Sequence, residues 1–489
     1  MGLFKILKKN VKLFPNKRAL IIDGSEYTFK EFFDLVLQTI LNLQKNNFKK
    51  NNIITIIEDN TLSHIVSLFA LSYIDCTVVP AGTYYSTEHL SRILKLTKCD
   101  GIIGPSIYCN LFKKKLKIKK FLSTDYSKKF PYFFSENNKK IFKNKGDNNK
   151  KKFIITFSSG STADPKPIVF SQKTKIVRFK LFKKLYKITN EDVFIVTSPI
   201  DHSLGMRTLY VPLLSGATCV IMPKFNPDNY CKLIKKYNVT FSVLIASQIY
   251  EISKKKLFKD FYLSKGLISA STKLFSSVKS KILKKKINLY EMYGAAEIGT
   301  VTNIAISKNE KKIKSVGKSY HKSIDIKIVS GKNKFLPYYE PGEIVCKTPG
   351  SFEGYLNSKN FNKEAYFKNY FRTGDIGYLD KDKYLYFLSR KKNIIRRSGL
   401  TIYPEDIESI FLKDGKIDEV AVIGKETKEH SKIYLYIKKN AKINDNYIKN
   451  LCLNKLSTFQ LPNKIIYLDK FPKTNLGKID KKKLLKLSI

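Results

Sequence analysis

The stretch TFSSGSTADPKPI, residues 156–168, has the composition of a phosphate-binding turn. It continues the apolar run FIITFSS at 153–159, which is expected to form a buried strand. Hydroxyl groups and free backbone amides can surround phosphate oxygens, and Lys166 adds a cation. The pattern GxxxxGK[ST] of a Walker A loop is absent, so alone the stretch favours phosphate binding only modestly over a polar surface loop. The candidate phosphate-binding residues are Ser158, Ser159, Gly160, Ser161, Thr162 and Lys166.

Strands and helices are expected to alternate on both sides of this stretch. Upstream, helical periodicity at 29–44 and 61–74 alternates with strand-like runs at 52–59 and 76–82. Further buried strands are predicted at 192–199, 218–223 and 241–247. Such alternation indicates α/β layers with largely parallel sheets. The lysine-rich, weakly periodic segment 111–152 is expected to be a surface excursion.

The last hundred residues follow a different pattern, which predicts a small α+β unit. Residues 384–399 are expected to form a short strand pair, and 404–413 a helix with Pro404 near its start. Further strands are predicted at 419–424, 432–439 and 464–469. The expected division is a large multi-sheet N-terminal domain, residues 1–388, and a small C-terminal domain, residues 389–489.

Composition limits the class of protein. The 489 residues are 43% apolar, enough for a large core, yet no run reaches the roughly 18–20 apolar residues of a membrane-spanning helix. The basic start MGLFKILKKNVKLF lacks the apolar stretch and cleavage site of a secretory signal. The seven cysteines form no CxxC pair, which argues against a zinc site or a disulfide framework. A cytoplasmic protein is expected, and contact with a membrane surface is left open.

The formal charge of +50 would ordinarily suggest a nucleic-acid partner. However, only eight of the 91 basic residues are arginine, the residue preferred for base and phosphate recognition. Lysine and asparagine are spread along the whole chain and tryptophan is absent, which is typical of an AT-rich codon bias. No specific nucleic-acid partner is therefore expected. Four of the rare arginines lie within 26 residues: Arg372, Arg390, Arg396 and Arg397.

Three further segments carry candidate site residues. LYEMYGAAEIG, 289–299, places Tyr293 and Gly294 just before Glu297, a carboxylate that could hold Mg²⁺. YFRTGDIGYLD, 370–380, holds Asp375 in a glycine-flanked turn, followed by Arg390. FPKTNLGKIDKK, 471–482, holds Lys478 in a short loop. Taken singly, these segments also fit a core tyrosine beside a turn, a hairpin with solvated charges, and one lysine among many.

In this order and spacing, the four segments resemble the adenylate-forming (AMP-binding) superfamily, which includes acyl-CoA synthetases, adenylation domains of peptide synthetases, and luciferases. The resemblance runs from Pro15 to Leu485 and its motifs are closest to those of acyl-CoA synthetases and fatty-acid–CoA ligases. It implies a mobile C-terminal domain and an active site between the domains. It also implies ATP and Mg²⁺ as cofactors, an acyl-AMP intermediate, and transfer of the acyl group to CoA or to the phosphopantetheine of a separate acyl carrier protein.

The resemblance also assigns roles to residues. Ser158 to Thr162 and Lys166 would bind the β- and γ-phosphates, Glu297 would hold Mg²⁺, and Lys478 would bridge the attacking carboxylate and the α-phosphate. Tyr293 would stack on adenine beside Ser269 and Ala270, while Asp375 and Arg390 would bind ribose. Lys392 matches the hinge, and Gly399 matches the glycine beside the pantetheine tunnel.

Two residues depart from the family pattern. Ala296 stands where a hydroxyl is expected near the α-phosphate, a loss of about 1.5–3 kcal/mol that would slow the enzyme without abolishing activity. Pro167 follows Lys166 where glycine is usual, and it removes a backbone amide.

The sequence leaves the subclass open. SPIDHSLG, 198–205, fits the PxxHxxG pattern of acyl-CoA ligases and would put His202 where the substrate carboxylate and the thiol meet. A rival alignment puts Asp201 where amino-acid-activating domains carry the acid that pairs with a substrate ammonium. A stand-alone amino-acid-activating or carrier-loading enzyme is the alternative within the superfamily. A catalytically silent homologue and a nucleic-acid-binding protein are the alternatives from other classes.

Overall fold

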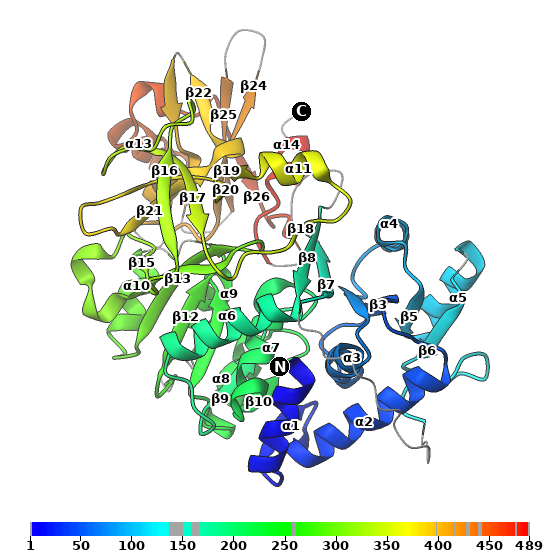
Figure 1. The fold of residues 1–489 in the computed structure, drawn as a ribbon. Helices are drawn as coiled ribbons and strands as arrows, with labels where there is room; N and C mark the ends of the chain where they lie inside the picture. Colours follow the sequence, from blue (N-terminus) through cyan, green and yellow to red (C-terminus); the bar gives the residue numbers. More distant parts are fainter. Residues whose placement is uncertain are drawn as a thin grey trace.

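The computed structural model describes residues 2–487, apart from 117, 136–149, 158–165, 257, 259–260, 273, 275, 398, 414–415, 427–430, 439–442 and 475–476. The described chain forms two large, mostly parallel sheets, an antiparallel sheet, and a smaller C-terminal α+β part (Figure 1). This arrangement confirms the predicted fold class. In the part of the chain that is described, no helix has both the length and the apolarity to cross a membrane.

The first large sheet contains seven strands among the described residues, in the order β18-β8-β7-β4-β3-β5-β6. Strands β3 to β7 pair in parallel, and β8 and β18 add antiparallel edges. The bounds are β3 Ile53–Ile57, β4 Thr77–Ala81, β5 Gly101–Gly104, β6 Lys120–Ser123, β7 Lys152–Phe157, β8 Pro167–Ser171 and β18 Gly354–Tyr355. The parallel strands are apolar almost throughout because both faces of the sheet are covered.

The second large sheet has nine strands in the described chain, in the order β15-β14-β13-β12-β11-β9-β10-β1-β2. Its middle strands are parallel, whereas β2, β14 and β15 are antiparallel. The bounds are β1 Arg18–Ile22, β2 Ser25–Thr28, β9 Val193–Val196, β10 Thr218–Ile221, β11 Phe241–Ile245, β12 Gly266–Ala270, β13 Leu289–Ala295, β14 Gly299–Ala305 and β15 Lys318–Ser319.

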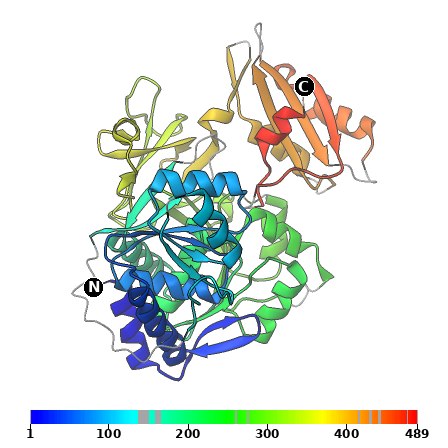
Figure 2. The same cartoon turned by 90° about the vertical axis from the view of Figure 1, so that its right-hand side faces the viewer.

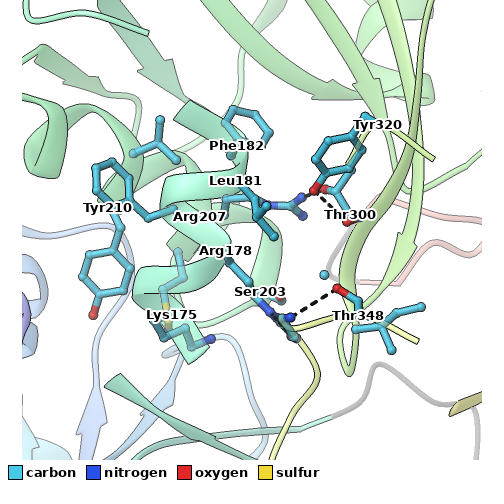
Figure 3. Close-up of a pocket in the computed structure, with 16 residues that line it drawn as sticks. Lys175, Arg178, Leu181, Phe182, Ser203, Arg207, Tyr210, Thr300, Tyr320 and Thr348 are labelled. Atoms are coloured by element: carbon cyan, nitrogen blue, oxygen red, sulfur yellow. Dashed lines mark hydrogen bonds between the residues drawn. The ribbon is translucent and has the colours of Figure 1, made fainter. Parts of the chain in front are cut away.

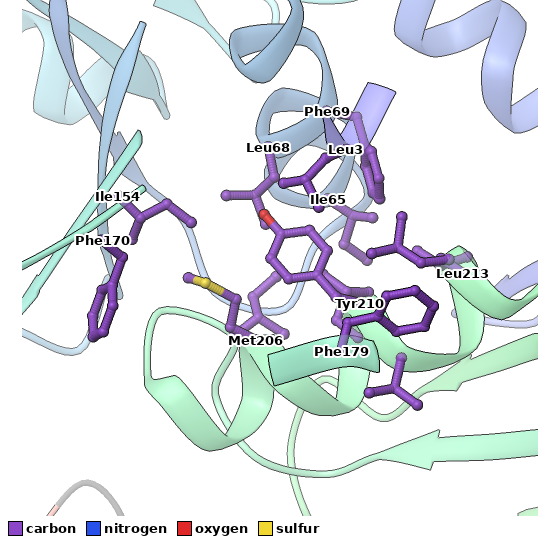
Figure 4. Packing of buried hydrophobic residues seen from close by; sticks show 14 of the residues in the cluster. Leu3, Ile65, Leu68, Phe69, Ile154, Phe170, Phe179, Met206, Tyr210 and Leu213 are labelled. Carbon is purple, nitrogen blue, oxygen red and sulfur yellow. The ribbon is translucent and has the colours of Figure 1, made fainter. Parts of the chain in front are cut away.

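One apolar core joins the two large sheets. It is built by helices α1 Leu3–Leu13, α2 Phe29–Lys45, α3 Leu62–Tyr73, α6 Gln172–Leu185 and α7 Ser203–Ser215. Figure 4 shows Tyr210 of α7 packed among Leu3 of α1, Ile65 and Leu68 of α3, and Phe179 of α6. The start of α2 is fixed by a capping box, in which the Glu31 carboxylate accepts the Thr28 amide at 2.8 Å while the Thr28 hydroxyl accepts the Glu31 amide at 3.2 Å.

Other helices cover the outer faces of the sheets. Helices α4 Thr87–Thr97 and α5 Ser106–Lys115 pack on the seven-stranded sheet. Helices α8 Pro227–Lys236, α9 Ala246–Ser253 and α10 Ser276–Leu283 pack on the nine-stranded sheet. Segment 111–152 contributes more than a surface excursion, because it includes β6, which extends the seven-stranded sheet beside β5. The two apolar residues of β6, Phe121 and Leu122, were too few to stand out among lysines.

The antiparallel sheet contains β16 Asp325–Val329, β17 Gly342–Lys347, β19 Tyr366–Phe367, β20 Tyr370–Leu379 and β21 Leu385–Arg390, with α11 Lys359–Glu364 nearby. After it, β22 Ile395–Arg397 pairs with β23 Leu400–Ile402. The predicted strand pair within 384–399 is therefore wrong: β21 pairs with β20 instead, and β22 turns back at Gly399.

The smaller C-terminal part stands to one side of the larger part (Figure 2). Its three-stranded sheet contains β24 Val420–Glu426, β25 Ser431–Lys438 and β26 Lys464–Leu468. Helices α12 Pro404–Leu412, α13 Asp445–Lys455 and α14 Lys481–Lys486 accompany it, and Pro404 occupies the first turn of α12 as predicted. Its apolar clusters consist of its own residues, which gives it a separate core.

Candidate active site

Asp375 lies at the centre of a polar cluster made by three strands. It faces Arg390 across the β20–β21 pair, and the Arg390 Nε lies 2.8 Å from one carboxylate oxygen. The Tyr293 hydroxyl, from β13, donates to the other oxygen at 2.7 Å. Asp375 is only 1% exposed, and burial raises the pKa of its carboxyl group, opposed by Arg390, Tyr293 and Lys478. The sequence-predicted nucleotide residues Tyr293, Asp375 and Arg390 therefore do come together.

Lys478 reaches this cluster from the C-terminal part. Its Nζ lies 3.5 Å from the Ser271 carbonyl oxygen, just past the end of β12. Beside it, a Cβ on Gly477 would lie 3.3 Å from Ile245, at the end of β11. Burial and the charge of Arg390 lower the pKa of Lys478 to about 8, against the opposing effect of Asp375. The lysine loop thus meets the carboxyl ends of parallel strands, where open α/β sheets bind ligands.

Glu297 lies two residues after the end of β13 and accepts a hydrogen bond of 3.0 Å from the Tyr355 hydroxyl of β18. The described residues contain no group of three or more His, Cys, Asp or Glu side chains arranged to hold a metal. A single protein carboxylate nevertheless suits Mg²⁺ bound mainly by phosphates and water. The donor set around Glu297 therefore fits a magnesium–nucleotide complex.

Of the remaining predicted nucleotide residues, Ser269, Ala270 and Gly294 lie at or near the ends of β12 and β13. Ser269 and Ala270 end β12 and are buried; the Ser269 Oγ has no hydrogen-bond partner among the described residues. Gly294 pairs with Thr300 across β13 and β14. The Lys166 Nζ lies 4.1 Å from the centre of the Phe361 ring. Ser158, Ser159, Gly160, Ser161 and Thr162 lie outside the described residues.

Lys392, the predicted hinge residue, and Gly399, the predicted residue of the pantetheine tunnel, both follow β21. Lys392 belongs to the short 3₁₀ helix Lys391–Asn393, between β21 and β22. Burial and the nearby charges of Arg390 and Lys482 lower its pKa. Gly399 has a φ of +77° in the turn between β22 and β23, and nothing lies within 4 Å of a Cβ built there. This backbone conformation favours glycine.

His202 stands immediately before α7 and contacts two side chains. Its Nε2 lies 3.1 Å from the Tyr84 hydroxyl and 3.9 Å from an Asp201 carboxylate oxygen. The Tyr84 hydroxyl donates to Asp201, which is 5% exposed. Burial and the Asp201 carboxylate raise the pKa of the Tyr84 phenol. Sequence reasoning missed Tyr84, because it is distant in the chain and belongs to no recognised motif.

Arg178 on α6 is a second residue that the sequence reasoning missed. It donates to three backbone carbonyls: Gly350 at 2.7 Å, Ala296 at 3.0 Å and Glu297 at 2.7 Å. It therefore fixes the turn that carries Glu297. The rarity of arginine could have revealed it, but attention fell on the group of four near residue 390. Of those four, Arg390 joins the cluster, whereas Arg372 pairs with Glu343 and Arg397 donates to carbonyls of Phe459 and Leu461.

The fold and this cluster define a nucleotide-dependent enzyme of the adenylate-forming class. The model of the AMP-binding enzyme family matches residues 7–356, and that of the AMP-binding enzyme C-terminal domain matches residues 406–478. The chain belongs to the AMP-binding enzyme family.

Particular relatives make the likeness more specific. The chain is 22% identical over 485 residues to a 2-succinylbenzoate–CoA ligase of Bacillus cereus (strain Q1), covering 98% of each chain. It is 24% identical to an uncharacterized acyl–CoA ligase of Bacillus subtilis (strain 168), covering 96% of this chain and 95% of the relative.

Solved structures agree on the fold. Bacillus subtilis o-succinylbenzoate CoA synthetase, in complex with its acyl-adenylate intermediate, superposes with a TM-score of 0.87 at 20% identity, over 99% of this chain and 98% of that one. ATP-bound MatB from Rhodopseudomonas palustris gives a TM-score of 0.90 at 19% identity, over 100% and 99% of the two chains. The prediction of an AMP-forming acid–CoA ligase that uses ATP, Mg²⁺ and CoA is confirmed at the level of the enzyme class.

Proposed function

We propose that the residues of this cluster activate a carboxylic acid in two steps, adenylation and transfer to a thiol. The observation that carries the proposal is the meeting of Lys478 and Arg390 with Asp375 and Tyr293 where the two parts join. In adenylation, a carboxylate oxygen bonds to the α-phosphorus of ATP as the bond to pyrophosphate breaks. Two anions approach each other in this step, and the charge of Lys478 would stabilise the resulting transition state.

The other residues would hold the reactants in place. Asp375 and Arg390 bind the ribose, Tyr293 lies against the adenine beside Ser269 and Ala270, and Glu297 holds Mg²⁺, which neutralises phosphate charge. Lys166 and the loop from Ser158 to Thr162 bind the outer phosphates. Support comes from the position of Ser269 and Ala270 at the end of β12, of Glu297 shortly after β13, and of the Asp375–Arg390 pair across β20 and β21.

Thioester formation would follow a rearrangement about Lys392. The thiol sulfur bonds to the acyl carbon, AMP leaves, and the thiol proton passes to solvent. His202, the N-cap residue of α7, would lie beside the thiol, and Gly399 leaves an open surface for a pantetheine arm. CoA is the proposed acceptor, with carrier-bound phosphopantetheine as the alternative. Cytoplasmic location is part of the proposal.

The proposed division places the adenylation domain at residues 1–388 and the mobile domain at 389–489. Two features support it: the antiparallel sheet ends with β21 at Arg390, and the C-terminal clusters have a core of their own. Contacts between the two parts include the Arg390–Asp375 ion pair and the contacts of Lys478 and Asp418.

Asp201 gives the amino-acid-activating alternative little support. It is buried, and one carboxylate oxygen already accepts the Tyr84 hydroxyl. A substrate ammonium would therefore have to share this buried carboxylate with the Tyr84 hydroxyl.

The deciding experiment is ATP–pyrophosphate exchange across a panel of carboxylic and amino acids, followed by thioester assays with CoA and with a phosphopantetheine-loaded carrier protein. Acid-dependent exchange followed by CoA thioester formation is the expected result. Exchange with amino acids alone would favour the amino-acid-activating alternative. ATP binding without exchange for any acid would contradict the proposal and favour a silent homologue.

A further inference from the structure

A small cavity lies directly behind the proposed reaction site. One wall is α7, starting with Ser203, the residue after His202; the opposite wall contains Ile298, Gly299 and Thr300, which follow Glu297. Helix α6 closes the space between them. An acid whose carboxylate lies at His202 and Lys478 would therefore point the rest of its structure towards this cavity. Figure 3 shows Arg207 reaching towards Thr300 and Tyr320, with Arg178 and Lys175 below it in the view.

The cavity is cationic. Lys175, Arg178 and Arg207 line it, and no aspartate or glutamate is among the lining residues that are described. Lys175 is 7% exposed, and both arginines are partly buried. Within the described part of the chain, none of the three forms an ion pair with a carboxylate. Burial lowers the pKa of all three groups; neighbouring arginines add to the effect at Lys175 and Arg178, whereas Tyr320 and Tyr186 oppose it at Arg207.

The three cations differ in how well they are satisfied. Arg178 donates to the backbone carbonyls of Gly350, Ala296 and Glu297, so its role is structural. The Lys175 Nζ lies 3.9 Å from the centre of the Phe170 ring, with no hydrogen bond to the described residues. Arg207 uses one nitrogen, which donates to the Thr300 hydroxyl and lies 3.8 Å from the Met292 sulfur. Lys175 and Arg207 therefore retain donors for a ligand.

The chain treats a purely structural buried lysine differently. Lys279, 1% exposed, is paired with the Glu291 carboxylate and also donates to the Ile313 carbonyl at 2.7 Å. Leaving a buried charge without such a partner is costly. At Lys175 and Arg207 the described chain places basic groups without a carboxylate partner, so an anion from outside would both hold their charge and complete the site.

We infer that the acid activated by this protein carries a second anionic group, a carboxylate at its far end, which Arg207 and Lys175 bind. The inference rests on the proposed function and specifies its substrate class. The cavity volume is about 30 Å³, room for only a few atoms. Ser203 and Arg207 are one helical turn apart, about 6 Å. A compact dicarboxylic acid fits this spacing, whereas a long fatty acyl chain does not.

The test compares acids matched in length. Exchange is measured with succinate, glutarate and adipate, with their monomethyl esters, and with butyrate and octanoate. The best dicarboxylic acid is expected to exceed its own monomethyl ester by about 10- to 100-fold in kcat/KM, the effect of one or two charge-assisted hydrogen bonds. Equal use of diacids and half-esters would overturn the inference while leaving the proposed function intact.

Two variants locate the effect. Arg207→Met and Lys175→Met each remove a charge at similar length, and each should lower the preference for the diacid over its half-ester by about tenfold. Lys175 forms no hydrogen bond to the described chain, so Lys175→Met should not destabilise the fold. It therefore tests the site even if Arg207→Met folds poorly. Lys180→Met, exposed on the same helix, is the matched control and should keep the full preference. A preference that survives both substitutions would overturn the inference.

A binding measurement separates this inference from the proposed function. Thermal shifts with each diacid and half-ester are recorded in the presence of AMP and Mg²⁺. A shift that is specific for the diacid and lost in Lys175→Met supports the second-anion site even if exchange fails, and failed exchange would count against the proposed function alone. Equal shifts with both ligands would count against the site.

Discussion

At the scale of single residues, burial and the nearby Arg390 destabilise the charged form of Lys478. It is close enough to Arg390 to be repelled and close enough to Asp375 to be partly compensated. Incoming carboxylate and phosphate would complete the compensation. The lysine therefore suits a step in which two anions must be brought together.

Replacing Lys478 with alanine should reduce acid-dependent pyrophosphate exchange by about 10²–10³-fold, the usual effect of removing one preorganised electrostatic group. Thioester formation from chemically prepared acyl-AMP should survive much better, because the lysine loop is proposed to move away before that step. Both half-reactions are assayed on the same preparation. Equal loss in the two would contradict the role given to Lys478.

The lowered pKa of Lys478 also predicts a pH dependence. Below about pH 8 the ammonium is charged, and above it the group becomes neutral in the free enzyme. The kcat/KM for adenylation should therefore fall as the pH rises through about 8. Lys478→Arg, whose guanidinium stays charged, should move this alkaline limb upward even if its rate is lower. An unchanged limb would assign the titration to another group.

Glu297→Gln tests the magnesium site. The amide oxygen can still accept the Tyr355 hydroxyl, so the local structure should hold, but a neutral amide is a poor ligand for Mg²⁺. The magnesium concentration for half-maximal exchange should rise by roughly tenfold or more, since even outer-shell changes cost 10- to 100-fold. Tyr355→Phe is the control for the hydrogen bond. A wild-type magnesium dependence in Glu297→Gln would rule out the metal role.

At the scale of elements, the connection between β21 and β22 controls how the two parts move. A 3₁₀ helix has φ near −50 to −70°, close to the φ of about −65° that proline requires, and the flanking Arg390 and Ile394 have φ of −75° and −59°. Lys392→Pro should therefore retain most pyrophosphate exchange and strongly reduce thioester formation, because it restricts rotation at the hinge. Proline disfavours the helical conformation of the preceding residue, so the melting temperature is measured first.

Lys392→Ala provides the comparison for this hinge, since it removes the charge and keeps the backbone free. It should form thioester nearly as well as the wild type. Wild-type thioester formation in Lys392→Pro would exclude Lys392 as the pivot. Loss of thioester formation in Lys392→Ala would instead show that the lysine side chain, rather than backbone rotation, is required.

At the scale of the whole molecule, Asp418 links the two parts in the described arrangement. Its carboxylate accepts the Tyr250 hydroxyl of α9 at 2.6 Å and lies 2.5 Å from the Lys254 Nζ. Because these groups are partly solvent-exposed, the link should contribute only about 0.5–1 kcal/mol. Asp418→Asn should slow exchange by about two- to fivefold and leave thioester formation from acyl-AMP unchanged.

Asp382→Asn serves as the control for Asp418, because Asp382 belongs to a surface pair with Lys312, which also contacts Asp380. It should leave both half-reactions near wild type. An equal effect of Asp418→Asn on both steps would mean that the contact supports the general fold rather than the adenylation arrangement.

The sequence by itself determined the features that depend on neighbouring residues in the chain, which are the single strands and helices and the short motifs. Apolar runs and turn residues predicted β3, β4 and β9 to β11 together with α2, α3 and α12, and glycine- and charge-bearing segments singled out Tyr293, Asp375, Arg390 and Lys478. Only the tertiary structure decided which distant groups meet. The pairing of β21 with β20, the Tyr84–His202 contact, and the shared cavity of Lys175 and Arg207 depend on how strands and helices far apart in the chain pack together, and periodicity within a segment carries no information about that packing.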